Sequence, residues 1–159
     1  MTAVDFQKAF DTVEHTSIWA ALLQMGVPAA YVGVLKTLYT GQRGTVITDK
    51  PSKSFPIKRG TKQGDPLSPS IFNAVLERVV DGIQSKWRRK GFGIQLGSGS
   101  SSVLCNLRFA DDILLLATSR KDVEEMLVDL STAANKAGLQ IHMGKTKISF
   151  ERSRGPTRE

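Results

Sequence analysis

The stretch that decides the fold reads LRFADDILLL and covers residues 107–116. Two adjacent carboxylates, Asp111 and Asp112, stand between two short apolar runs, each with the length and composition of a β-strand. Because Asp is a common turn residue, the pattern predicts a β-hairpin whose turn carries the acids. Turn chemistry alone would also explain the pair, and both side chains would then simply face water.

A third acid, Asp5, closes another short apolar segment, AVDF at residues 3–6, which is interpreted as a strand. Three carboxylates gathered at one sheet edge repel one another, and an unpaired carboxylate is costly to desolvate. Divalent cations remove that cost, and paired metal ions about 3.5–4 Å apart are a common device for phosphoryl transfer. The sequence therefore predicts a metal site formed jointly by Asp5, Asp111 and Asp112.

Size, charge and cysteine content narrow the class of protein. The 159 residues fit one domain, and 22 Lys and Arg against 15 Asp and Glu give a formal charge of +7, which favours an anionic partner. The lone Cys105 lies in an apolar run and is interpreted as core packing. No apolar run approaches the ~20 residues that cross a bilayer, and the first residues do not resemble a signal peptide. We therefore expect an intracellular protein without a membrane partner.

The remaining pattern predicts a mixture of helices and strands. Helices are expected over residues 16–24, 28–41, 68–90 and 119–137. Besides the strand at residues 2–6 and the acidic hairpin, strands are expected over residues 45–48, 54–58, 139–142 and 146–150. Residues 59–67 should form a Gly- and Pro-rich loop. This order favours an α+β fold, an antiparallel sheet with helices packed on one face.

Four ordered segments resemble the motifs of reverse transcriptases. FADD at residues 109–112 resembles the catalytic box, and DFQKAFDTV at residues 5–13 resembles the first palm motif. RGTKQGDPLSP at residues 59–69 resembles the second, and GLQI followed by KT, within residues 138–146, resembles the fourth. The wording is most similar to that of non-LTR (LINE-type) retrotransposon enzymes, with group II intron enzymes as near relatives.

The resemblance implies a polymerase palm with part of the fingers over residues 1–151, and a polar tail at residues 152–159 that is expected to be disordered. It implies an RNA-directed DNA polymerase that extends a primer 3′-hydroxyl with dNTPs. Two Mg²⁺ ions are the expected cofactors, with Mn²⁺ as a substitute. The expected partners are an RNA template, a DNA primer, dNTPs and the missing fingers and thumb of a parent polyprotein. Without those segments we expect the chain alone to be weakly active or inactive.

The resemblance also implies the catalytic residues. Asp5 and Asp111 would be the principal metal ligands, and Asp112 would support the metal and the primer end. The carbonyl of Phe6 would add a backbone ligand, and Lys145 matches a lysine placed near the leaving pyrophosphate. Carboxylate and carbonyl oxygens are the ligands that hard cations such as Mg²⁺ prefer.

Substrate contacts are implied by the same motifs. Phe10 matches a bulky aromatic that closes the space of a ribose 2′-hydroxyl, with core packing as the alternative. Gln63 and Gly64 match a pair that contacts the nucleotide and the template, and a merely structural Gly/Pro loop is the alternative. Arg59 and Lys62 are expected to contact phosphates.

Several other polar residues are interpreted as structural. Asp11 suits a turn and His15 a hydrogen bond within the fold. The basic cluster KWRRK at residues 86–90 suits a helix C-terminus, and a contact with nucleic-acid backbone is the alternative. The family usually has Asn where this chain has His142, which leaves the local geometry of Lys145 open.

Two other functions remain open at the level of sequence. The first is a retroelement-derived remnant without activity, which would bind nucleic acid or nothing. The second is an RNA-directed RNA polymerase, which shares the two-metal palm. Phe10 and the FADD wording speak against the RNA polymerase.

Overall fold

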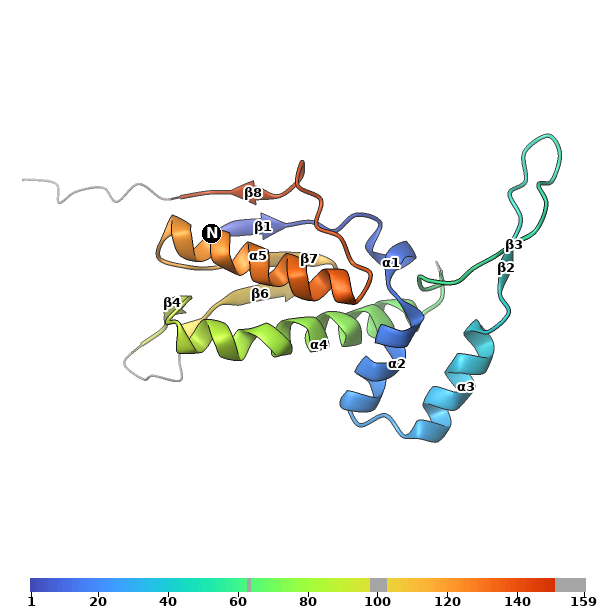
Figure 1. Ribbon diagram of the computed structural model, residues 1–159, viewed down its shortest axis with the longest axis horizontal. Coiled ribbons are helices and arrows are strands. Elements are labelled where there is room, and N and C mark those ends of the chain that lie inside the picture. The colour runs from blue at the N-terminus through green and yellow to red at the C-terminus, as the bar shows by residue number, and fades with distance from the viewer. Residues whose placement is uncertain (63, 98–102, 151–159) are drawn as a thin grey trace, which may run out of the picture.

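The computed structural model describes residues 1–62, 64–97 and 103–150, and its centre is a four-stranded antiparallel sheet in the order β6-β7-β1-β8. The strands are β1 (Thr2–Val4), β6 (Asn106–Phe109), β7 (Asp112–Leu115) and β8 (Lys147–Ile148). The first strand of the chain therefore lies between a strand of the acidic hairpin and the last strand (Figure 1). The predicted acidic hairpin is confirmed.

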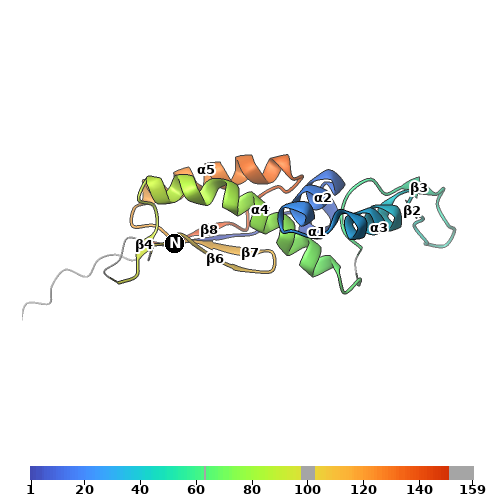
Figure 2. The same ribbon diagram turned by 90° about the horizontal axis from the view of Figure 1, so that it is seen from below.

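Two long helices, α4 (Ser68–Arg89) and α5 (Arg120–Lys136), lie on the same side of the sheet (Figure 2). Alternate strand residues are buried on that side, including Val4, Ile113 and Leu115. The helices bury Phe72 and Met126 in the same core. The prediction of an α+β fold with helices packed on one face of an antiparallel sheet is thus confirmed.

A helical lobe extends the molecule beyond the sheet (Figure 1). It contains α1 (Ala9–Thr12), α2 (His15–Gln24) and α3 (Ala29–Tyr39). Helix α2 packs on α4, and α3 packs on α2. The lobe ends in a hairpin formed by β2 (Arg43–Gly44) and β3 (Phe55–Pro56), which projects past α3. We call residues 43–58 the arm.

The four predicted helices are confirmed, because their end signals are local. Gly26 follows α2 with a φ of +84°, and Gly138 follows α5 with a φ of +83°, a conformation that glycine adopts without strain. The Ser119 hydroxyl accepts a hydrogen bond from the Asp122 N–H and so caps α5. The short helix α1 was not predicted.

The positions of two predicted strands are wrong. In the arm, pairing lies at residues 43–44 and 55–56, because Val46 and Ser52 exchange hydrogen bonds that begin a loop. Residues 139–142 form one isolated bridge instead of a strand, because the chain turns where the His142 carbonyl accepts two N–H groups.

A second pair of short strands, β4 (Ile94–Gln95) and β5 (Val103–Leu104), was not predicted as a pair. The predicted tail at residues 152–159 lies outside the described residues. Among the helices of the described part of the chain, none is both long and apolar enough to cross a membrane.

Candidate active site

Asp5 follows β1 and Asp112 begins β7, so the two residues lie at the same end of two neighbouring strands. In the ladder between β1 and β7, Val4 pairs with Ile113, so Asp5 and Asp112 are the next pair in the same register. Cross-strand partners share a face of a sheet, and successive residues alternate between faces. Because Val4 and Ile113 are buried beneath the helices, this alternation directs Asp5 and Asp112 to the opposite face.

Ala110 and Asp111 form the two-residue turn of the acidic hairpin, because Phe109 pairs with Asp112 on either side of them. Ala110 has a φ of +53°, a left-handed conformation that costs a residue with a side chain about 1–2 kcal/mol. Two-residue hairpin turns require such angles, since their twist matches that of the strands. The turn leaves Asp111 half-buried and Phe109 82% exposed.

A turn inside the fourth motif brings Lys145 to Asp5. The His142 N–H donates to the Asp5 carbonyl at 2.7 Å, and the His142 carbonyl accepts from the N–H groups of Lys145 and Thr146, both at 3.0 Å. The Lys145 Nζ then lies 3.6 Å from the Asp5 Oδ2. The backbone of residue 142 makes all these bonds, so His in place of Asn leaves Lys145 within reach of Asp5.

The three acids do not form a closed metal site. Within residues 1–62, 64–97 and 103–150, no group of three or more His, Cys, Asp or Glu side chains is placed so that it could hold a metal ion. The strand register nevertheless brings Asp5, Asp111 and Asp112 to one end of the sheet. Their oxygens are the donors that Mg²⁺ prefers, and a cation, the ammonium of Lys145, already lies against Asp5.

A cavity of about 420 Å³ lies next to the pair of Asp5 and Lys145. Its walls come from the segments at residues 6–12 and 140–145, and Lys8 and Gln140 are among its lining residues. Lys8 has a φ of +45° and precedes helix α1. Lys8 and Gln140 were not predicted from the sequence. Each lies inside a motif, and neither belongs to a residue pattern that would indicate a functional side chain.

Residues 59–61 are clamped against the first motif. The Gly60 N–H donates to the Val13 carbonyl at 2.8 Å, and the Thr61 N–H donates to the Phe10 carbonyl at 2.6 Å. A Cβ at Gly60 would lie 2.7 Å from the Asp11 carbonyl oxygen, so only glycine fits. The ring of His15 lies with Nε2 3.0 Å from the Gly60 carbonyl, which agrees with a structural role for this histidine.

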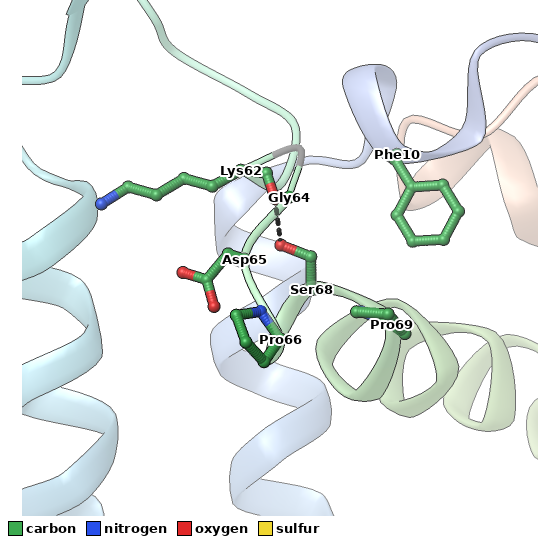
Figure 3. A pocket seen from close by; sticks show the side chains of 7 residues that line it. All are labelled: Phe10, Lys62, Gly64, Asp65, Pro66, Ser68 and Pro69. Atoms are coloured by element: carbon green, nitrogen blue, oxygen red, sulfur yellow. Dashed lines mark hydrogen bonds between the residues drawn. The ribbon is translucent and has the colours of Figure 1, made fainter.

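The clamp creates a cavity of about 460 Å³ (Figure 3), whose lining includes Phe10, Lys62, Gly64 and Ser68. The Phe10 ring also packs on Phe72, with the two ring centroids 4.7 Å apart. The Ser68 hydroxyl donates to the Lys62 carbonyl and holds the loop over the start of α4 (Figure 3). Phe10 and Gly64, which are 54 positions apart in the sequence, therefore line the same cavity.

The structure gives less direct support to the other substrate contacts predicted in this loop. The Lys62 side chain extends away from Phe10 (Figure 3), and its Nζ lies 5.8 Å from the centroid of the Tyr39 ring. Arg59 is exposed, and its backbone forms an isolated antiparallel β-bridge with that of Glu14. Gln63 lies outside the described residues.

The basic cluster at residues 86–90 fastens two helices together. The Lys86 Nζ lies 2.6 Å from Asp129 of α5, Trp87 is fully buried and donates to the same carboxylate, and Lys90 pairs with Glu125. These contacts support the structural interpretation of the cluster, since three of its five side chains are engaged within the fold.

Known proteins share these motifs. Residues 1–155 match the family described as Reverse transcriptase (RNA-dependent DNA polymerase). The chain is 32% identical over 143 residues to the Retrovirus-related Pol polyprotein from type-2 retrotransposable element R2DM of Drosophila melanogaster, which covers 89% of this chain. It is 37% identical over 138 residues to the Retrovirus-related Pol polyprotein from type-1 retrotransposable element R2 of Popillia japonica, which covers 85% of this chain.

A vertebrate protein is also similar. The Transposon TX1 uncharacterized 149 kDa protein of Xenopus laevis is 27% identical over 154 residues, which covers 96% of this chain. The matched parts make up 13%, 18% and 11% of the lengths of the Drosophila, Popillia and Xenopus proteins. The chain thus spans less than a fifth of each relative.

Proposed function

Because the chain belongs to the reverse transcriptase family, and is similar to the Pol proteins of non-LTR retrotransposons, we propose that residues 1–151 are the palm, with part of the fingers, of an RNA-directed DNA polymerase. It extends a primer 3′-hydroxyl with dNTPs on an RNA template. The strand register that sets Asp5 beside Asp112, next to the turn that holds Asp111, is the observation that carries the proposal.

The three acids, together with the carbonyl of Phe6, are the proposed ligands of Mg²⁺. When bound, Mg²⁺ would activate the primer 3′-hydroxyl and neutralise the charge of the leaving pyrophosphate. Asp5 and Asp111 supply the main carboxylates, and Asp112 supports them from the strand that follows the turn. Like charges oppose the closure of three carboxylates on one point, and the Lys145 ammonium offsets part of that repulsion at Asp5.

Each of the two cavities takes one part of the dNTP substrate. Phe10 closes the sugar side of the 460 Å³ cavity, and Gly64, without a side chain, lets a base pair approach its wall. Gln63 contacts the nucleotide beside Gly64, while Arg59 and Lys62 contact phosphates. The smaller cavity next to Asp5 takes the pyrophosphate end, where Lys145 holds or donates a proton.

Metal binding tests the proposed ligands without a need for activity. Mn²⁺ titration of the chain, followed by the relaxation of water protons, should show binding that Asp5→Asn and Asp111→Asn each weaken by about tenfold or more. Asp81→Asn, an exposed acid of α4, is the matched control and should leave binding unchanged. Equal Mn²⁺ affinity in the parent chain and the Asp111→Asn variant would contradict the assignment.

Primer extension tests the reaction itself. In a chimera, residues 1–150 would replace the matching segment of the Drosophila R2DM protein. The rest of that protein supplies the surrounding parts, since the matched segment makes up only 13% of its length. We expect this chimera to incorporate dNTPs on an RNA template with Mg²⁺, and its Asp111→Asn form to be inactive. A chimera that folds and binds RNA but incorporates no nucleotide would refute the polymerase proposal.

A further inference from the structure

The positive charge of the chain is concentrated in the part of the helical lobe that begins with α2. Residues 15–62 contain seven Lys and Arg and a single acid, Asp49, for a net charge of +6. The other 111 residues contain 15 cations and 14 acids, for a net charge of +1. Almost the whole formal charge of +7 therefore lies in α2, α3, the arm, the residues that join them and the four residues that follow the arm.

The ion pairs in the described part of the chain lie elsewhere. Those found among residues 1–62, 64–97 and 103–150 all join side chains outside residues 15–62. In the arm, Lys50, Lys53 and Lys58 are exposed. The lobe thus presents its cations to solvent, whereas several cations of the sheet and its helices are neutralised within the fold.

The arm is a built hairpin with two different faces. Gly44 pairs with Phe55 and shares its face, and Arg43 faces the other side. The Phe55 ring covers Gly44 so closely that a Cβ there would lie 2.9 Å from two ring atoms. On the other side, the Arg43 guanidinium donates to the hydroxyl and the carbonyl of Ser54, both at 2.9 Å.

Exposed apolar side chains accompany the cations of the arm. Ile47 is 81% exposed, Val46 is 54% exposed, and Phe55 is 45% exposed although it covers Gly44. A nucleic-acid duplex presents mainly phosphates to such a surface, because its bases are stacked inside. A single strand presents both phosphates and the faces of its bases, which apolar and aromatic side chains contact. The combination favours a single strand.

The arm leads directly to the cavity at Phe10. After Lys58 the chain passes through Arg59 and the clamped residue Gly60, and then reaches Lys62 and Gly64 in the cavity wall. In both ribbon views the arm lies at the end of the molecule opposite β4 (Figure 1 and Figure 2). A strand that follows these cations would therefore reach the cavity from outside the sheet.

We propose that the arm binds the phosphate backbone of single-stranded RNA before it enters the Phe10 cavity. The proposal rests on the proposed function in one respect, because the bound strand would be the template. The binding itself needs no catalysis, so it can be measured on the chain as it is.

The test compares two triple variants of equal charge. The arm variant carries Lys50→Gln, Lys53→Gln and Lys58→Gln, and it spares Arg43, which fixes the hairpin. The control variant carries Arg89→Gln, Lys121→Gln and Lys136→Gln, three exposed cations outside the lobe. Affinity for a fluorescent 20-nucleotide single-stranded RNA, and for the same sequence as a duplex, is measured by anisotropy over a range of salt concentrations.

We expect the arm variant to bind the single strand about tenfold or more weakly than the parent chain, with a salt dependence reduced by up to about 2 in slope, since each phosphate contact contributes ~0.7. The control variant should lose less than about twofold. Equal losses in the two variants, no binding by the parent chain, or a loss confined to the duplex would overturn the proposal.

The same experiment separates this proposal from the polymerase. An arm variant that loses RNA binding, beside a folded chimera that incorporates no nucleotide, would sustain the arm and refute the polymerase. If the arm and control variants bound RNA equally well and the chimera were active, the arm proposal would be refuted and the polymerase proposal sustained.

Discussion

The side chain of Phe10 contributes to the core and to a cavity at the same time. It packs on Phe72 with a centroid separation of 4.7 Å, and it lines the 460 Å³ cavity with Gly64. Core packing and a substrate contact were alternative interpretations of this residue in the sequence. Because the residue is only half-buried, one position can both pack on the core and line the cavity.

Phe10→Ala should therefore alter sugar choice and stability together. In the chimera it should raise rNTP incorporation relative to dNTP by about tenfold or more, because the ring no longer closes on the 2′-hydroxyl. In the chain, the lost packing on Phe72 should lower the free energy of unfolding by about 2 kcal/mol. Phe72→Leu is the control, since it disturbs the same packing without lining the cavity, and unchanged sugar discrimination in Phe10→Ala would refute the role.

Cys105 gives the chain a pH-dependent stability. Burial raises the pKa of its thiol, an effect that the Arg88 guanidinium partly offsets, and the Sγ donates to the Phe92 carbonyl at 3.0 Å. The folded chain thus retains the thiol proton to a higher pH than the unfolded chain, whose thiol has a pKa of about 8.5. This contribution is complete below that pH and is lost as the pH rises through the folded pKa.

Urea unfolding at about pH 7 and about pH 9.5 measures this loss. The parent chain should lose more unfolding free energy across the interval than the Cys105→Ala variant, which lacks the thiol and keeps the other titrating groups. The same loss in both chains would show that the thiol does not contribute.

The acids could be predicted from the sequence, because their signals are local. Asp111 and Asp112 lie where two apolar runs meet, and Asp5 ends a third run. The approach of Lys145 to Asp5 could be expected only from the family resemblance, since it depends on a backbone hydrogen bond of His142 to a residue 137 positions away. The expected closure of the three acids into one metal-holding group is not seen among the described residues.

At the scale of elements, a largely buried carboxylate joins the two helices that cover the sheet. Asp129 of α5 accepts from the Lys86 Nζ at 2.6 Å and from the indole Nε1 of Trp87 at 3.1 Å. The Asp129 side chain is 14% exposed, and Trp87 is fully buried. Glu125, which pairs with Lys90 between the same two helices, is more exposed, with 35% of its side chain accessible.

Asp129→Ala should therefore lower the free energy of unfolding by about 1–3 kcal/mol, because it leaves the buried indole N–H without an acceptor. Glu125→Ala removes the neighbouring exposed pair and should cost less than about 1 kcal/mol. Urea titrations followed by tryptophan fluorescence measure both. If Glu125→Ala proved as damaging as Asp129→Ala, burial of the carboxylate would not be the source of the stabilisation.

The elements that the sequence predicted best are those with signals in their own residues. Helices α4 and α5 have apolar residues at helical spacing along most of their length, and Ser119 and Gly138 mark the ends of α5. The predicted strand positions were wrong where the pairing partner, and not the composition of the segment, decides which residues form the strand. Residues 45–48 have strand composition but lie in the loop of the arm, since pairing begins at Arg43.

At the scale of the whole molecule, the site depends on the pairing of the first strand, β1, with β8, the last described strand. Strand β1 pairs with β7 on one side and with β8 on the other, so the last strand makes β1 an inner strand. Gln7 donates to the Gln140 carbonyl, and Leu139 and Ile141 are buried in the core. The segment at residues 138–150 therefore supports the first motif along its length.

A chain that ends at residue 137 should lose cooperative folding, with Asp5 freed from its neighbours. Removal of Leu139 and Ile141 alone forfeits about 1.5–3 kcal/mol for each buried side chain, which is a large part of the 5–15 kcal/mol typical of a whole domain. It also makes β1 an edge strand with unpaired N–H and C=O groups. A chain that ends at residue 150 keeps every contact described here and is the control. Circular dichroism during urea titration compares the two, and a shared sharp transition at the same urea concentration would mean that β1 and β7 hold the site without the last strand.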